Sequence, residues 1–202
     1  MKLKIAFFAL LCAATVLLTG CGGDVVYKNG IADIKNANIT ISFPEDWTVV
    51  VGGDVYSELL NTLDYESVSA DTMKAIYESG GARLLLVSRS PDENVFAMFT
   101  QGHNEGGKSA EDIVRAMRDD SVASFDSYDY FTVAESSLGE YTWGGVTGAM
   151  SVVRLAVKED GSVFTEQRNF CFERDDTVFW LQIHISGGFE READGIEIAA
   201  VE

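Results

Sequence analysis

The chain has 202 residues and a formal net charge of −17 at pH 7. This length is enough for one domain with a sizeable core. Such a negative surface excludes nucleic acid as a partner, because it repels phosphates, and it suits a protein that must stay soluble outside the cell.

The first 21 residues have the order of a bacterial export signal. Lys2 and Lys4 supply positive charge, residues 5–18 form an uncharged apolar run, and Leu18-Thr19-Gly20-Cys21 follows. The run is shorter than the roughly 20 residues that span a bilayer. The last four residues resemble the bacterial lipobox, in which the cysteine receives a diacylglycerol and the chain is cut before it. The resemblance implies a lipoprotein acylated at Cys21; the alternative is an uncleaved anchor or a plain secretory signal.

The lipobox divides the chain into three expected parts. Residues 1–20 would be the signal peptide, residues 21–36 a lipid-anchored tether, and residues 37–202 a single domain. Each methylene of an acyl chain that enters the membrane contributes about 0.8 kcal/mol of binding free energy. The acylated protein would therefore stay on the extracytoplasmic face of a cell membrane or outer membrane without spanning it. With Cys12 in the signal and Cys21 acylated, Cys171 has no partner for an intrachain disulfide.

Apolar periodicity and turn residues predict a mixture of strands and helices in the first half of the chain. The expected strands cover residues 39–43, 47–51, 83–89 and 95–101, with a further short strand at 25–27. The expected helices cover residues 54–63, 69–78 and 109–123.

The second half is dominated by strands. A short strand is expected at 130–134, followed by three long strands at 145–158, 162–173 and 177–186, and a closing helix at 189–201. Turn-forming residues join the three long strands, which should therefore form an antiparallel meander. In the last strand one face is expected to carry Phe179, Leu181, Ile183 and Ile185, and the other Trp180, Gln182 and His184.

These elements predict an α+β fold: an antiparallel sheet of about six to seven strands flanked by helices. A strand ending in Phe43-Pro44 with Trp47 close behind, then helices, a long meander and a terminal helix, resembles the Mog1/PsbP-like group. The resemblance covers about residues 37–202 and implies an α/β/α sandwich. It also implies a binding or assembly role more often than catalysis, and it supplies no catalytic motif.

The segment from Gly102 to Ser109 fits the P-loop pattern G-x-x-x-x-G-K-[ST], between an expected strand and an expected helix. In a P-loop, Lys108 would reach terminal phosphates and Ser109 would hold magnesium. The later strands form hairpins, however, whereas P-loop enzymes need a parallel sheet. The favoured interpretation is a surface loop in which Ser109 caps the helix and Asp112 completes a capping box.

Other residues with chemical potential have simpler explanations. Cys171 and His184 could form a thiol–imidazole pair, but a lone cysteine in a strand is usually a buried apolar residue. Asp126 and Asp129 could bind calcium weakly, although no acidic cluster matches an EF-hand loop.

Three residues could mark a recognition surface. Trp180, Arg168 and His184 would form one if their sheet face were open; the alternative is that a helix covers that face and Trp180 is core. No zinc motif, catalytic residue or cofactor site is expected.

The sequence therefore predicts a non-enzymatic, lipid-anchored lipoprotein that binds a protein partner or a small ligand of the cell envelope. Its membrane contact would be the acyl chains on Cys21. The alternative is an exported hydrolase or nucleotide-binding protein that uses the segment from Gly102 to Ser109. A contiguous pocket with converging polar groups would favour the alternative, and an acidic surface with one exposed apolar patch would favour the lipoprotein module.

Overall fold

A computed structural model describes residues 25–65, 67–104, 106–126, 128–189 and 193–201, with Asp126 described only in its backbone. The expected signal peptide and Cys21 lie outside these residues. No helix in the described ranges is long and apolar enough to cross a membrane.

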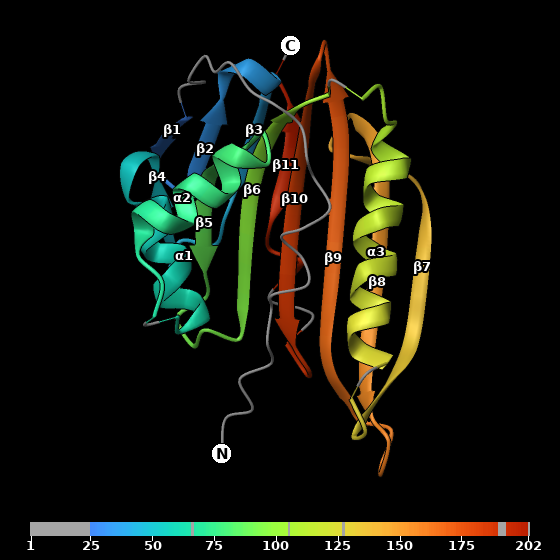
Figure 1. Cartoon of the computed structure of the whole chain (residues 1–202). Helices are drawn as coiled ribbons and strands as arrows, with labels where there is room; N and C mark the ends of the chain where they lie inside the picture. The colour runs from blue at the N-terminus through green and yellow to red at the C-terminus, as the bar shows by residue number, and fades with distance from the viewer. Residues whose placement is uncertain (1–24, 66, 105, 127, 190–192, 202) are drawn as a thin grey trace.

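The fold is α+β and is built around an antiparallel sheet of seven strands (Figure 1). In spatial order its strands are β4 (Thr48–Val51), β5 (Ala82–Arg89), β6 (Val95–His103), β10 (Thr177–Ser186), β9 (Val163–Arg174), β8 (Val146–Val157) and β7 (Phe131–Trp143). The expected meander of three long strands is confirmed, since β8, β9 and β10 pair consecutively and antiparallel. The strand count of six to seven is confirmed for this sheet as well.

A second antiparallel sheet of four strands covers one face of the large sheet. Its strands, in order, are β1 (Val25–Lys28), β2 (Ile31–Ile34), β3 (Ile39–Ser42) and β11 (Glu197–Ala200). The main core lies between the two sheets, where Phe99, Phe172 and Phe179 stack with ring centroids 5.4–6.3 Å apart. Phe179, Leu181, Ile183 and Ile185 all join this core, as the alternation along the strand predicted.

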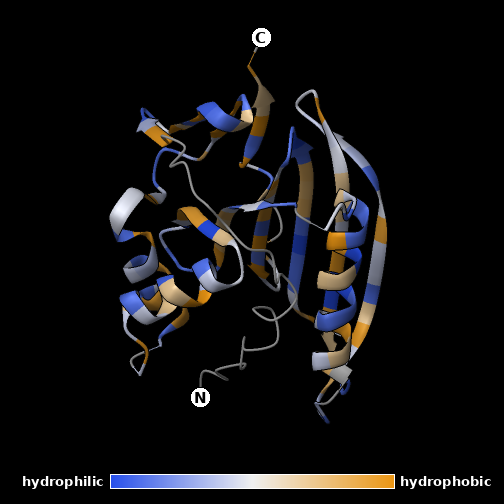
Figure 2. Cartoon of the chain, turned by 45° about the horizontal axis from the view of Figure 1, so that its top comes forward, coloured by the Kyte–Doolittle hydropathy of each residue, from blue (hydrophilic) through white to orange (hydrophobic). Residues whose placement is uncertain are grey.

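Three helices cover the opposite face of the large sheet: α1 (Val55–Leu63), α2 (Ala70–Ser79) and α3 (Ala110–Asp126). All three were expected within a few residues. Ser69 caps α2 by accepting a hydrogen bond from the Thr72 amide at 3.1 Å. Hydrophobic and hydrophilic bands follow one another along α3 (Figure 2), and its buried residues Val114, Met117 and Ser121 recur at the spacing of one helix face, as in an amphipathic helix. The layers therefore run helices, large sheet, small sheet.

The amino-terminal segment differs from the expected tether. β1 and β2 form a hairpin that continues into β3, and Ala32 and Ile34 are fully buried. Asn29 and Gly30 both have positive φ, which is the backbone of a tight type I′ hairpin turn. The folded part therefore begins by Val25, because this Asn-Gly pair is a hairpin turn and not part of a loose linker.

The carboxyl-terminal segment also differs from the prediction. A closing helix was expected over residues 189–201, whereas Glu197–Ala200 is β11, paired with β3. Ile196 and Ile198 bury their side chains in the core between the sheets, and this burial outweighs the helix preference of the alanines. The strand expected at 130–134 is also longer, since β7 continues to Trp143 along the exposed edge of the sheet.

Candidate functional site

The helices leave a strip of the large sheet between them that carries polar side chains. α1 and α2 pack over β5 and β6, and α3 packs over β8 and β9 (Figure 1). Between these two apolar clusters, β9 and β10 present Gln167, Asn169, Gln182 and His184. All four side chains are buried. We call these four residues the polar strip.

The amides of the polar strip form a hydrogen-bonded network. The Gln167 and Gln182 amide nitrogens both donate to Asn169 Oδ1, at 3.1 and 3.3 Å. Asn169 Nδ2 donates to Ser151 Oγ at 3.3 Å, and Ser121 Oγ of α3 donates to Gln167 Oε1 at 3.2 Å. Because each bond offsets the cost of burying an amide, the network keeps an uncharged polar surface under the helices.

A cavity of about 730 Å³ opens at one end of the polar strip. The end of α1, the turn between β5 and β6, Phe125 of α3 and the adjoining ends of β8, β9 and β10 surround it. Gln167 and His184 contribute the buried polar part of its wall. The volume falls within the range of small-molecule sites, which are usually apolar with a few placed polar groups.

The charge of the cavity wall limits what it can hold. The described residues that line the cavity include Asp64 and Glu93 but no lysine or arginine. His184 is neutral, because burial lowers the pKa of its imidazole to about 3. Its ring stacks on Phe96, with centroids 4.4 Å apart and an interplanar angle of 13°. The cavity thus disfavours anions and suits a largely apolar ligand with hydrogen-bonding groups.

Cys171 and His184 do not form a catalytic pair. Cys171 lies opposite Trp180 in the sheet and His184 lies opposite Gln167, so Asn169 and Gln182 separate them on that face. Cys171 is fully buried, and burial raises the pKa of its thiol above the ordinary value. The thiol is therefore a packing group, as the sequence favoured.

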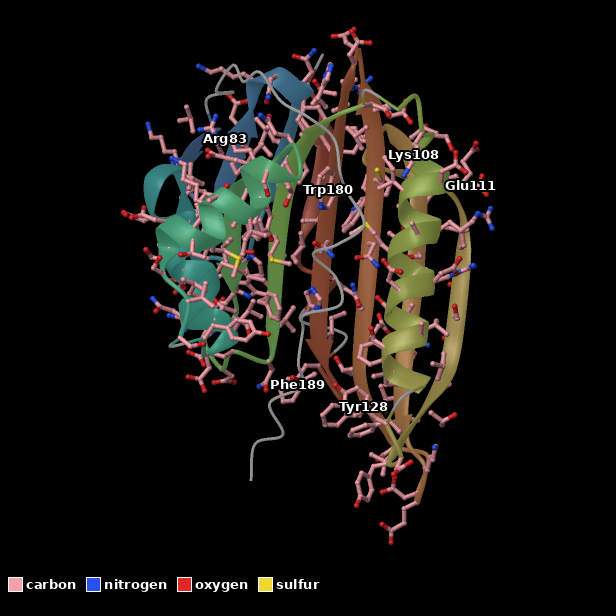
Figure 3. The ribbon with its side chains drawn as sticks, in the orientation of Figure 1. Arg83, Lys108, Glu111, Tyr128, Trp180 and Phe189 are labelled. Carbon is pink, nitrogen blue, oxygen red and sulfur yellow. The ribbon has the colours of Figure 1, made fainter. Side chains whose placement is uncertain are left out.

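The proposed recognition surface of Trp180, Arg168 and His184 does not exist as one face. Trp180 packs against the apolar cluster under α3, and Figure 3 shows it on β10 between the helices. Arg168 lies opposite Ile183 in the register and therefore points to the other side of the sheet. The sheet therefore separates Arg168 from Trp180 and His184, although the sequence predicts that the three could share one surface.

On that other side a buried carboxylate joins two arginines. Glu166 accepts a hydrogen bond from the Nε atom of both Arg154 and Arg168. Arg154 also donates to Glu135 at 2.6 Å, and Arg168 to Asp194 at 3.0 Å. The hydrogen bond to Glu166 contributes to raising the pKa of both guanidinium groups. We call this group the Glu166 cluster; the sequence does not predict it, because its members come from β7, β8, β9 and the segment before β11.

The segment from Gly102 to Ser109 contains the predicted capping box. The Asp112 amide donates to Ser109 Oγ at 3.1 Å, and the Ser109 amide donates to Asp112 Oδ2 at 3.2 Å. These bonds to Ser109 hold the pKa of the Asp112 carboxyl below its usual value. The strand before the loop, β6, pairs antiparallel with both of its neighbours, which is not a P-loop context. Glu105 lies outside the described residues.

The possible calcium pair is only partly described. Asp129 is exposed, and the side chain of Asp126 lies outside the described residues. Within those residues, no group of three or more His, Cys, Asp or Glu side chains could hold a metal ion.

Comparison with known proteins adds little to this geometry. No family model matches the chain, and no curated protein matches it. Among solved structures it is similar to the cyanobacterial PsbP protein CyanoP of Synechocystis sp. PCC 6803, at 10% identity and a TM-score of 0.46 over 90% of this chain and 98% of that one. It is also similar to LpqN of Mycobacterium tuberculosis, a protein involved in cell envelope biogenesis, at 11% identity and 0.42 over 81% and 83%.

A third similar structure is a protein of Bacteroides thetaiotaomicron VPI-5482, at 13% identity and a TM-score of 0.38 over 83% of this chain. The chain spans 46% of the length of that protein. At these identities and TM-scores the likenesses carry no function across. The resemblance to the Mog1/PsbP-like group remains a prediction, and the α+β class rests on the two sheets themselves.

Proposed function

We propose that this protein is a lipoprotein, held by acyl chains on Cys21 at the extracytoplasmic face of a bacterial membrane. Its folded part would be a non-enzymatic binding module. Its ligand would be a small, largely apolar molecule without negative charge, held in the cavity between α1 and α3. The observation that carries this proposal is the cavity of about 730 Å³, with neutral His184 and Gln167 in its wall.

The cavity meets the criterion of converging polar groups, yet it does not favour the hydrolase or nucleotide alternative. It lies away from the segment 102–109, none of which lines it. A nucleotide would bring several negative charges to a wall that holds Asp64 and Glu93. An apolar ligand with a hydroxyl or amide group would instead bury apolar area and meet hydrogen-bonding partners.

The anchor is tested by the fate of Cys21→Ser in a bacterial host that processes lipoproteins. We expect the variant to lose incorporation of labelled palmitate and to leave the membrane fraction, because one thiol accepts the lipid. Cys12→Ser, which lies in the apolar run, is the matched control and should stay acylated. Equal acylation of both variants would overturn the anchor.

The cavity is tested with N-phenyl-1-naphthylamine, an uncharged apolar dye that becomes fluorescent when buried. Val157 lines the cavity, so Val157→Trp should fill it and weaken dye binding by about tenfold or more, which corresponds to 1.4 kcal/mol of lost contact. Val201 is 50% exposed and lies outside the cavity, so Val201→Trp should bind the dye as the wild type does. Equal binding by both variants, with unchanged circular dichroism, would overturn the assignment.

A further inference from the structure

The connection between the expected lipid anchor and the folded part is very short. Cys21 is followed by Gly22, Gly23 and Asp24, and β1 begins at Val25. Four residue steps reach about 14 Å at most, even when fully extended. If Cys21 is acylated, the start of β1 must therefore lie within about one strand length of the lipid headgroups.

Val25 belongs to the folded part of the protein. β1 pairs along its length with β2, whose Ala32 and Ile34 are fully buried in the core between the sheets. β1 is also an edge strand of the small sheet, on the side of the large sheet opposite the helices. A short connection to a paired edge strand leaves little freedom, so the surface that faces the membrane must lie near the start of β1.

The outer face of this hairpin has the chemistry of a membrane contact. Val26 and Ile31 are 48% and 44% exposed, and Lys28 is exposed beside them. The register places Lys28 opposite Ile31 and Val26 opposite Asp33, so the four side chains share one face. Lys35 follows β2 directly and is exposed as well. Exposed apolar residues with neighbouring lysines are typical of surfaces that lie at a lipid headgroup layer.

Charge separates this surface from the rest of the molecule. Residues 25–42 contain Lys28 and Lys35 against Asp33 alone, a net charge of +1. Glu197 of β11 shares this outer face, because Ser42 pairs with both Ile31 and Glu197, so the face carries no net charge in a chain whose total is −17. An anionic membrane repels the acidic remainder and attracts the two lysines. Both forces turn the same edge of the molecule toward the lipid.

We propose that the β1–β2 hairpin docks on the membrane surface. Val26 and Ile31 lie at the headgroup boundary, and Lys28 and Lys35 lie on lipid phosphates. This inference rests on the proposed acylation of Cys21. It places the large sheet and its helices on the side away from the lipid, where the cavity faces the aqueous envelope.

The test uses the full-length acylated protein in vesicles of phosphatidylethanolamine and phosphatidylglycerol. A bimane probe is attached at Val26→Cys or, as the control, at Ile76→Cys, a residue of α2 that is 38% exposed and does not line the cavity. The remaining thiol, Cys171, is fully buried. Acrylamide in the buffer should quench the probe at position 76 and fail to quench it at position 26, and a quencher carried by lipid headgroups should do the reverse.

A charge variant tests the lysines. Lys28→Glu with Lys35→Glu should lower the ratio of docked to undocked protein by at least about fivefold for each lysine, since each is worth about 1 kcal/mol at an anionic surface. Lys74→Glu with Lys158→Glu is the control of equal charge, on α2 and after β8, and should leave the ratio unchanged.

Failure of the docking and failure of the anchor give different results. Equal acrylamide quenching at positions 26 and 76 would overturn the docking. If Cys21→Ser nevertheless leaves the membrane fraction, the anchor stands. Acylation that persists in Cys21→Ser would overturn the anchor, and the docking with it.

Discussion

At the scale of single residues, Glu166 is the only Asp, Glu, Lys or Arg that is buried in the described part of the chain. Its side chain is 1% exposed and is bonded by two arginines. Glu166→Gln leaves both guanidinium groups without their buried counter-charge, so we expect the free energy of unfolding to fall by about 3 kcal/mol. That is the lower end of the range for buried pairs, because the arginines are partly exposed.

Glu135→Gln is the matched control for Glu166→Gln. Glu135 bonds the same Arg154, but its side chain is 44% exposed, and the expected loss is below about 1 kcal/mol. Urea unfolding measures the free energy of unfolding of both variants, which can be compared when its dependence on urea concentration is the same in each. Equal losses would show that the burial of Glu166 does not decide the stability of the cluster.

His184 gives the protein a dependence of stability on pH. Burial lowers its pKa from an ordinary 6.5 to about 3, so between these values the unfolded chain binds a proton that the folded protein does not. Stability therefore falls as the pH is lowered from 6.5 toward 3, by up to about 1.4 kcal/mol per pH unit. His184→Gln should lose less stability than the wild type between pH 7 and pH 5, measured by urea unfolding. Parallel pH profiles for the two proteins would contradict this assignment.

At the scale of elements, the hairpin between β7 and β8 holds the last strand in place. Gly144 has φ of +53°, and a Cβ there would lie 1.6 Å from the Ile198 carbonyl oxygen of β11. Gly145 has φ of +81°, but a Cβ there would meet only Ala200, at 3.6 Å. Alanine at either position adopts a left-handed backbone at a cost of about 1–2 kcal/mol.

Gly144→Ala should therefore be the more destabilising change of this pair. Beyond the backbone cost it must displace β11, which we expect to add at least about 2 kcal/mol. Hydrogen exchange should show faster exchange of the Ala200 amide, which donates to the Gly144 carbonyl at 2.9 Å. If Gly145→Ala loses as much stability and opens β11 equally, close packing at Gly144 is not the reason that the strand is held.

The elements themselves differ in how well the sequence predicted them. The three helices and the long strands were predictable because periodicity of 3.6 or 2 continues over many residues. The short strand expected at residues 25–27 is present as β1, and the two errors concern other short strands. Ile31–Ile34 is four residues long after an Asn-Gly pair and lies in the expected tether, and Glu197–Ala200 contains two alanines, so neither has a strong local preference. Their partner strands decide both structures, since β2 pairs with β1 and β3, and β11 pairs with β3.

At the scale of the whole molecule, the candidate site was the least predictable feature. Alternation along β10 correctly placed Gln182 and His184 opposite the core face. It could not show that α1 and α3 stand apart over them, because that spacing depends on where the helices pack on the sheet. The cavity is lined by segments from residue 62 to residue 187, and only the tertiary fold brings them together.

The whole molecule also decides whether the segment 102–109 can bind a nucleotide. Phosphate binding at a helix start needs backbone amides that are open to an anion. Here the Ala110 amide donates a hydrogen bond to the Glu173 carboxylate of β9, and the Ser109 amide donates one to the Asp112 carboxylate. An incoming phosphate would face two carboxylates, on a chain with a net charge of −17.

We therefore expect millimolar ATP or GTP with magnesium to leave the melting temperature of the protein unchanged. A ligand that binds only the folded state must raise the melting temperature by mass action, and at a hundred times its dissociation constant it adds about 2.7 kcal/mol of stability. Lys108→Ala is the control, because Lys108 is the side chain that a P-loop would use for phosphate. A shift in the wild type that Lys108→Ala abolishes would make this loop a phosphate site despite its carboxylates. A flat response in both proteins is expected, since Glu173 and Asp112 already occupy the amides that a phosphate needs.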